Sequence, residues 1–480
     1  MKNSTQVVAL IFIFLLGFTS IAQQKKWTLQ ECVAYALKNN ISIKQSELDI
    51  KLANINKSTA IGNFLPSINA GASHSWNIGL NQNITTGLLE NQTTQFTSAS
   101  LNSNITIYNG LQNQNRLRRA KMAQLASEYQ LNKMQDDISL YVSNAYLDIL
   151  FNKENLKVQQ GQQTNDEKQL QRTQELVNAG SVPRGDLLDM KATIAADNQK
   201  VVTAENSLLI SRLSLAQLLQ LEDFENFDVS EVNIEPTPSP VMDEKPETIV
   251  EKAKQIRAEI KIAQANLDLA QKDIKIAKGA YQPSLIGFYS FSTRASYSDR
   301  ISGFALNATN PTSIIGQVEG TGQNVLQPNF LPIFSKSAPV FDQFSDNKGH
   351  NFGLQLNIPI LNGLSARNNV ERSKVSLERS KNAFNQANLD LETNVYKAIT
   401  NAKGALKTYE SSLATLEARQ QAYNYAKEKY AVGIMNAFDF NQSQTIFVTA
   451  QSDAIRAKYD YIFKTKIVEL YFGIPIIQKQ

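Results

Sequence analysis

The sequence predicts an α+β membrane protein made of two tandem structural repeats, each with amphipathic β-strands and very long antiparallel coiled-coil helices. Three observations support this fold class. First, two stretches of 116 and 115 residues, which begin after Pro66 and after Pro359, contain no proline, and a proline inside a helix costs about 3 kcal/mol or more. Second, the chain matches itself at a fixed offset. Third, the hydrophobic period changes from two to seven within each copy.

The N-terminus has the layout of a secretory signal. Lys2 precedes an apolar run from Val7 to Phe18, and small residues follow up to Ala22. We expect cleavage after Ala22, so residues 1–22 are interpreted as a signal peptide and the protein as exported. The run is shorter than the roughly 20 residues of a transmembrane helix. Nothing in the mature chain reaches 18 consecutive apolar residues, so any membrane span must be made of strands.

An internal repeat organises the mature chain. Ile107–Leu111 recurs as Ile360–Leu364, an offset of 253 residues. Two further pairs have the same offset: Gly180 with Gly433, and Asp186 with Asp439. An earlier marker, Leu65–Ile68, matches Gln282–Leu285 at an offset of 217, so the second copy carries an insertion of 36 residues. We therefore predict a first repeat at 23–235, a Pro-rich linker at 236–246 and a second repeat at 247–480, with the insertion as an extracellular loop at about 297–349.

Each repeat begins with a predicted helix followed by two strands. The first helix runs from about Thr28 to Ile61, where good helix formers are uninterrupted. After Pro66 the apolar residues alternate with polar ones, and a second alternating run precedes Gly110. The apolar face of this second run comprises Ala99, Leu101, Ile105 and Ile107, and that of its counterpart comprises Phe352, Leu354, Leu356, Ile358 and Ile360. Strands of about 10 to 12 residues with one apolar face are typical of a transmembrane β-barrel.

Long helices follow the strands, one on each side of Gly180 and of Gly433. The return helix carries apolar residues at intervals of seven: Leu187, Ile194, Val201, Leu208 and Leu215, with Phe440, Phe447, Ala454, Tyr461 and Val468 at the offset of 253. A strict heptad over five positions in both copies predicts a coiled coil, because an amphipathic helix on a globular core would drift from a seven-residue period.

Apparatus for catalysis is missing from the sequence. Cys32 is the one cysteine, and the two histidines, His74 and His350, lie far apart among polar residues. Nucleotide-binding and hydrolase motifs are absent, and the net charge of +4 without a clustered basic face argues against a nucleic-acid partner. We expect no enzyme activity, no cofactor and no metal site.

Four amphipathic strands per chain cannot close a barrel, and an open sheet edge cannot face lipid. Several chains must therefore contribute strands to a common barrel, with the helices continuing it as a tube. Basic residues near the start of the first long helix, Arg116, Arg118 and Arg119, either meet lipid phosphates or form a solvated helix face.

The sequence resembles the TolC-like outer-membrane factor (outer-membrane efflux protein) family over nearly the whole mature chain. The order of short motifs carries the resemblance: Trp27–Glu31, Ala36-Leu37, Asn39-Asn40, Leu65–Ser67, Asn109-Gly110, Asn362-Gly363, Gly180–Asp189 and Tyr430–Gln442. The family resemblance implies a homotrimer in the cell outer membrane, with a 12-stranded β-barrel, four strands from each chain, and an α-helical tunnel in the periplasm. It also implies a periplasmic adaptor protein and an inner-membrane pump as partners, in tripartite efflux or type I secretion.

The resemblance also assigns roles at the helix turns. Gly180, Ser181, Gly433 and Ile434 correspond to tips that dock to the adaptor. Tyr430 and Asp186 match a pair that latches neighbouring helices, and Asp439 matches a ring residue at the narrowest point of the pore. Met435 and Gln442 replace an arginine and an aspartate of the family pattern, for which Arg184 and Asp189 are possible substitutes. The predicted pore gate therefore comprises Asp186, Asp189, Tyr430, Asp439 and Gln442.

An exported coiled-coil structural or adhesive protein without a pore is the alternative. It explains the heptads and the signal peptide but gives no reason for strands that recur at a fixed distance from the turns. The sequence does not name the transported substrate, the partner pump or the role of the long loop.

Overall fold

The computed structural model describes residues 26–82, 87–224, 226–231, 235–236 and 238–476. The described residues form two compact units. The helical unit comprises those of Met1–Ile55, Lys121–Ala270 and Val375–Gln480, and the strand unit those of Asn56–Ala120 and Gln271–Lys374. The predicted signal peptide lies outside the described residues. None of the helices in this part of the chain is both long and apolar enough to cross a membrane.

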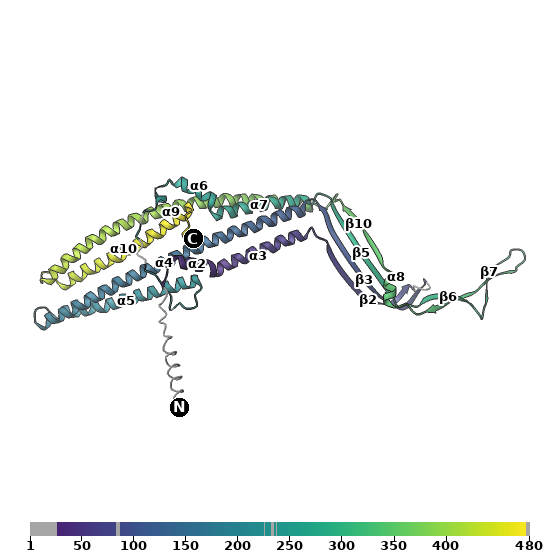
Figure 1. Cartoon of the computed structure of the whole chain (residues 1–480), viewed down its shortest axis with the longest axis horizontal. Helices are drawn as coiled ribbons and strands as arrows, with labels where there is room; N and C mark the ends of the chain where they lie inside the picture. The colour runs from purple at the N-terminus through teal and green to yellow at the C-terminus, as the bar shows by residue number, and fades with distance from the viewer. Residues whose placement is uncertain (1–25, 83–86, 225, 232–234, 237, 477–480) are drawn as a thin grey trace, which may run out of the picture. The chain divides into compact units, whose positions relative to one another are not determined.

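One antiparallel sheet of four strands forms the centre of the strand unit (Figure 1). Its strands are β2 (Ser67–Gln82), β3 (Leu89–Asn109), β5 (Ser284–Ser296) and β10 (Gly349–Asn357). The order is β10-β5-β3-β2, so the pairing of β3 with β5 joins the two repeats and leaves β2 and β10 at the edges. The four strands were predicted from the alternating pattern. Their predicted length was wrong for β2 and β3, which have 16 and 21 residues.

The last strand is shorter than predicted. Ile358 and Ile360 were expected on the apolar face of this strand, but pairing ends where Asn357 faces Ser284. Pro359 follows, and a proline has no backbone N–H to donate to a neighbouring strand. The alternating pattern therefore continues in the sequence beyond the point where the sheet can continue.

The predicted loop at 297–349 contains regular structure. Two two-stranded antiparallel sheets occupy most of it, and a short helix precedes β10. These elements are β6 (Arg300–Leu306), β7 (Thr312–Gln317), β8 (Asn324–Pro328), β9 (Phe330–Ser335) and α8 (Val340–Asp346). The hairpin of β7 and β8 lies between β6 and β9, which pair with each other.

The first predicted helix is broken into two, α2 (Leu29–Asn39) and α3 (Ile41–Gly62). The prediction of one continuous helix was wrong at Asn40, where the helix is interrupted because the backbone is extended, with φ −60° and ψ 133°. Its side chain accepts a hydrogen bond from the Ser42 N–H and donates one to the Leu218 carbonyl. The second repeat breaks at Arg257, 217 residues later, between α6 (Pro246–Ile256) and α7 (Ala258–Gly279).

The chain forms two long helical hairpins, and their lengths repeat. The first consists of α4 (Gln112–Asn178) and α5 (Arg184–Leu219), and the second of α9 (Ser365–Ala431) and α10 (Ala437–Phe472). In each hairpin the helices have 67 and 36 residues. A helix of 67 residues is about 100 Å long. The internal repeat predicted from the sequence is therefore present in the structure.

The heptad positions of both return helices are buried or half-buried. In the second hairpin they pack against tyrosines of α9 that recur at multiples of seven. The ring of Tyr423 stacks on Phe447 with the centroids 5.1 Å apart, and Tyr409 stacks on Tyr461 at 6.3 Å. The predicted coiled-coil packing is thus confirmed within the hairpin.

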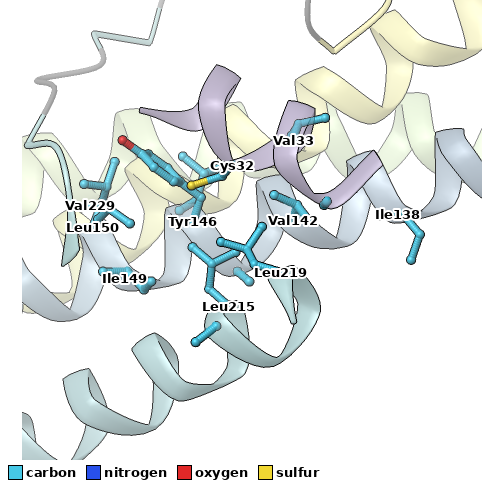
Figure 2. Packing of buried hydrophobic residues seen from close by; sticks show 14 of the residues in the cluster. Cys32, Val33, Ile138, Val142, Tyr146, Ile149, Leu150, Leu215, Leu219 and Val229 are labelled. Atoms are coloured by element: carbon cyan, nitrogen blue, oxygen red, sulfur yellow. The ribbon is translucent and has the colours of Figure 1, made fainter. Parts of the chain in front are cut away.

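A hydrophobic cluster joins the start of the chain to the middle of the first hairpin (Figure 2). The hydroxyl of Tyr146 lies within 3.0 Å of the Ser230 carbonyl oxygen, beside a two-stranded parallel sheet of β1 (Lys26–Trp27) and β4 (Asp228–Val229). Cys32 is fully buried in this cluster, and burial raises the pKa of its thiol to about 12. Cys32 is therefore a packing residue rather than a nucleophile.

Candidate functional site: the hairpin tips

The two hairpin tips have the same backbone geometry. In the first, Ser181 N–H donates to the Leu176 carbonyl at 2.9 Å, and in the second, Ile434 N–H donates to the Lys429 carbonyl at 2.9 Å. Such a bond from beyond the helix end to a carbonyl five residues earlier is one bond of a Schellman motif. Each residue of the second tip lies 253 positions after its counterpart, so the turn is part of the repeat.

Glycine allows this turn. Gly180 has φ +74° and Gly433 has φ +78°, a left-handed conformation that is strained for residues with a Cβ atom. A Cβ atom built at either glycine would have nothing within 4 Å. The requirement for glycine is therefore conformational and not steric.

The second tip exposes large apolar side chains. Ile434 is 77% exposed and Phe438 is 73% exposed. Ser181, the counterpart of Ile434 in the first tip, is also exposed. Exposed apolar side chains at a tip are typical of a surface that binds another protein.

The predicted gate residues all lie within about three turns of the tips. Asp186 is half-buried and Asp189 exposed in the first turns of α5, while Asp439 and Gln442 are exposed in the first turns of α10. Carboxylates at a helix N-terminus interact favourably with the helix dipole. Tyr430, half-buried, is the penultimate residue of α9.

Asp439 also has a local structural role. Its N–H donates to Asn436 Oδ1 at 2.8 Å, and its Oδ2 accepts a hydrogen bond from Asn436 Nδ2 at 3.0 Å. This reciprocal pair caps the N-terminus of α10. The cap of α5 is Pro183, which makes no side-chain hydrogen bond. Asp186 and Asp439 are therefore equivalent in position but not in their local contacts.

Tyr430 lies in an aromatic stack. Its ring is 4.7 Å from that of Phe440, with an angle of 7° between the planes. Pairing of Tyr430 with Asp186 stays a prediction. The predicted substitutes for the family's missing gate residues, Arg184 and Asp189, are both exposed.

The contacts that join the two hairpins near the tips were not anticipated from the sequence. Arg172 of α4 donates from Nη2 to the Ala431 carbonyl at the end of α9 at 3.2 Å. Asn441 of α10 donates to Thr193 Oγ1 of α5 at 3.4 Å. The repeat gives no signal for them, since the position equivalent to Arg172 is Tyr425.

A buried polar cluster lies deeper between the hairpins. Asp166 of α4 and Asp197 of α5 are 1% and 2% exposed. Gln444 of α10 donates from Nε2 to Asp166 Oδ1 at 2.6 Å. Burial, together with a hydrogen bond that the protonated Asp166 makes to Asp197, raises the pKa of Asp166 to about 7. One sequence signal existed: Asp197 stands three residues after the heptad position Ile194, where a coiled coil normally has an apolar residue.

A groove with a volume of about 680 Å³ runs beside this cluster, and its lining includes Asp166, Asp197 and Gln442. It places one predicted gate residue, Gln442, near the buried carboxyl pair. In the strand unit, Arg119 forms an ion pair with Asp273 at 2.5 Å, so at least one basic residue considered for lipid contact has a partner within the chain.

Comparison with known proteins gives one family. The model of the outer membrane efflux protein family matches residues 33–220 and 249–464, one match in each repeat. A search of curated proteins gives no significant match.

Solved structures with the same fold include outer membrane channels and an outer membrane protein. CmeC of Campylobacter jejuni has a TM-score of 0.74 and 18% identity, covering 94% of this chain and 87% of its own. VceC of Vibrio cholerae has a TM-score of 0.72 and 13% identity, covering 93% and 96%. The open state of MtrE of Neisseria gonorrhoeae has a TM-score of 0.67 and 16% identity, covering 94% and 91%. At these identities the likeness shows the fold.

Proposed function

Because the chain belongs to the outer membrane efflux protein family, we propose that it is the outer-membrane exit duct of a tripartite efflux or type I secretion system. Three copies assemble into one channel, each contributing four strands to a 12-stranded barrel and two hairpins to a helical tunnel in the periplasm. The duct is passive, and energy comes from an inner-membrane pump that a periplasmic adaptor joins to the hairpin tips.

The observation that carries this proposal is the four-stranded sheet with two unpaired edges. Strands β2 and β10 each pair with one neighbour within the chain. Exposed apolar residues lie on both edge strands: Ile68, Trp76, Ile78 and Leu80 on β2, and Phe352, Leu354 and Leu356 on β10. A sheet edge cannot face hydrocarbon, because its backbone groups would lack hydrogen-bond partners. Copies of the same chain, joined β2 to β10, satisfy both edges.

The hairpin tips support the placement of the adaptor contact and the gate. Two identical turns, with exposed apolar side chains on the second, suit docking to another protein. Around a threefold axis the carboxylates of Asp186 and Asp439 form one acidic ring, since they are equivalent by the repeat. Asp189, Tyr430 and Gln442 complete the proposed gate. Closely spaced carboxylates repel one another unless cations occupy the ring, so the pore prefers cations and multivalent cations block it.

The decisive experiment combines planar-bilayer conductance of the detergent-purified protein with its oligomer mass. A trimer with discrete conductance supports the duct. A monomer or dimer without conductance contradicts it and favours the alternative, an exported coiled-coil structural protein without a pore.

A matched pair of variants tests the barrel itself. Leu354 and Gln355 are neighbours on β10 whose side chains lie on opposite faces of the sheet. On the proposed lipid face, Leu354→Arg costs about 2–4 kcal/mol near the bilayer centre and reduces membrane insertion. On the proposed lumen face, Gln355→Arg leaves insertion unchanged and lowers cation selectivity. Equal effects of the two variants on insertion would contradict the assignment of the faces.

A further inference from the structure

We propose that Asp166, Asp197 and Gln444 form a proton-dependent latch, in which a proton shared by the two carboxyl groups keeps the second helical hairpin bound to the first. This inference rests on the proposed function, because it assigns to these buried residues the regulation of the duct near its tips. Asp166 lies 12 residues before the end of α4, about 18 Å from the tip at 1.5 Å per residue.

The latch joins three helices. Gln444 Nε2 of α10 donates to Asp166 Oδ1 of α4 at 2.6 Å, and both side chains are about 1–2% exposed. Gln162, one turn earlier on α4, donates to Asp166 Oδ2 at 2.6 Å. Asp197 of α5 completes the group, with its Oδ1 bound to the Lys200 ammonium at 3.0 Å. The contact between Gln444 and Asp166 is thus a buried hydrogen bond between the two hairpins.

One proton satisfies the remaining buried oxygen. Asp197 Oδ2 is buried without a hydrogen-bond donor among the described residues. A proton on Asp166 Oδ2 provides that donor: Asp166 then donates to Asp197 Oδ2, while its Oδ1 still accepts from Gln444. Two ionised carboxylates in contact and shielded from water would instead repel each other strongly. The geometry therefore places the shared proton on Asp166, beside the carboxyl group of Asp197 that binds Lys200.

The other groups around the pair are few. The titratable side chains facing Asp166 are Asp197 and Lys200 on α5 and Tyr423 on α9, whose own pKa is raised by burial and by the charge of Asp166. Asp453 and Arg456 of α10 line the adjoining groove. Among the described residues, the ion pair with this carboxyl pair is the one between Lys200 and Asp197. The pKa of Asp166 is raised to about 7, so its proton is lost near neutral pH.

The alternative explanation for these buried carboxyl groups is that they set the register of the coiled coil. The second repeat argues against it. The positions equivalent to Asp166 and Asp197 are Arg419 and Ala450, and Ala450 is buried at 6% exposure. The second hairpin nevertheless has the same helix lengths as the first. Helices of these lengths therefore form without a carboxyl pair, which is consistent with a role of the pair beyond the fold.

Loss of the shared proton weakens the latch. Above neutral pH Asp166 is charged beside the carboxyl group of Asp197. The hydrogen bond from Gln444 favours this charged form, but burial, which is the larger effect, opposes it. Separation of the hairpins exposes Asp166 to water and therefore becomes more favourable once the proton is lost. The duct is consequently more closed at pH 6 than at pH 8.

The test measures the proton, the helix contact and the channel separately, in the full-length trimer. Asp166→Asn mimics the neutral acid, since its amide can donate to Asp197 while its oxygen accepts from Gln444. Gln444→Leu removes the link between the hairpins. Glu167→Gln, which neutralises the adjacent exposed carboxylate on α4, is the matched control.

For the wild type, infrared difference spectra should show a carboxylic acid that titrates near pH 7 and is missing in Asp166→Asn. Between pH 6 and pH 8 the protonated fraction of such a group falls from about 90% to about 10%. We expect the resting open probability to rise by up to about tenfold from pH 6 to pH 8. Hydrogen exchange in residues 440–450 should also become faster over this range, after correction for the pH dependence of the intrinsic exchange rate. Asp166→Asn should stay closed at both pH values, Gln444→Leu should be open at both, and Glu167→Gln should follow the wild type.

If the infrared spectra show no carboxylic acid that titrates in the wild type and is lost in Asp166→Asn, the proposal of a shared proton is wrong. If the acid titrates but hydrogen exchange and conductance do not change with pH, the pair is structural and the latch is wrong. If the protein conducts under no condition, the proposed duct fails, and hydrogen exchange still decides whether the proton controls contact between the hairpins.

Discussion

The aromatic rings of Tyr430 and Phe440 stack 4.7 Å apart with an interplanar angle of 7°. Phe440 is also 5.9 Å from the ring of Tyr423, one heptad earlier on α9. The stack ties the end of α9 to the first turn of α10 around the glycine turn. Tyr430 therefore contributes its ring to the fold of the tip, which leaves its hydroxyl group for a contact in the assembled channel.

Replacement of Tyr430 separates these two roles. Tyr430→Phe keeps the stack and removes only the hydroxyl, so we expect unchanged thermal stability but a higher resting conductance. Tyr430→Ala should also lower stability, by about 1 kcal/mol for the lost aromatic pair beyond the lost burial. Single-channel recording and thermal unfolding monitor the two effects. Wild-type conductance in the Phe variant would exclude the hydroxyl from the gate.

Asp439 requires a substitution that preserves its cap. Asp439→Ala would lose the charge and the hydrogen bond that Asn436 Nδ2 donates to Asp439 Oδ2, whereas the backbone N–H would still donate to Asn436 Oδ1. Asp439→Asn removes the charge and keeps a side chain able to bond. We expect it to weaken block by multivalent cations added on the periplasmic side. Asp460→Asn, a charge removal elsewhere on α10, is the control, and equal loss of block in both variants would contradict an acidic ring at Asp439.

The role of the tip glycines can be tested with substitutions that differ in how well they adopt the left-handed conformation. Gly433→Val forces a β-branched residue into the left-handed region, at a cost of about 1–2 kcal/mol or more. In Gly433→Asn the new asparagine tolerates the left-handed conformation. The Cβ atom of either variant would have no atom within 4 Å, so the two differ only in conformational cost. We predict that Gly433→Val and Gly180→Val abolish export while trimer formation and insertion persist, and that the Asn variants retain export in part. Export at the wild-type level in the Val variants would place docking elsewhere.

The hairpin of β7 and β8 provides a topology test. Its turn contains Gly320 and Gly322, both with positive φ and with open space around them. An epitope tag inserted after Gly320 should therefore leave the fold unchanged and be labelled on intact cells. The control is a tag after Ser181 in the first hairpin tip, which should be labelled only after permeabilisation. The reverse pattern would invert the proposed orientation.

The sequence alone determined the repeated plan of this protein. Prolines are missing wherever a long helix exists, and the heptads persist through α5 and α10, because these signals are local and act on every residue of an element. The four strands and both glycine turns were likewise predictable, since alternation and left-handed glycines are properties of short segments. The alternating pattern continues to Ile358 and Ile360, although the strand ends at Asn357. Pro359 ends it, because a proline cannot donate a backbone hydrogen bond to the neighbouring strand.

Only the tertiary structure decided which side chains meet across elements. Asn40 ends α2 because its amide reaches the carbonyl of Leu218, 178 residues away. The pairing of Asp166 with Gln444 spans 278 residues, and nothing in the spacing of either residue marks it. Asp439 was recognised by its place in the repeat, but its bond to Asn436 required coordinates. Hydrogen bonds between distant segments depend on the packing of whole helices, and no periodicity within one segment encodes that packing.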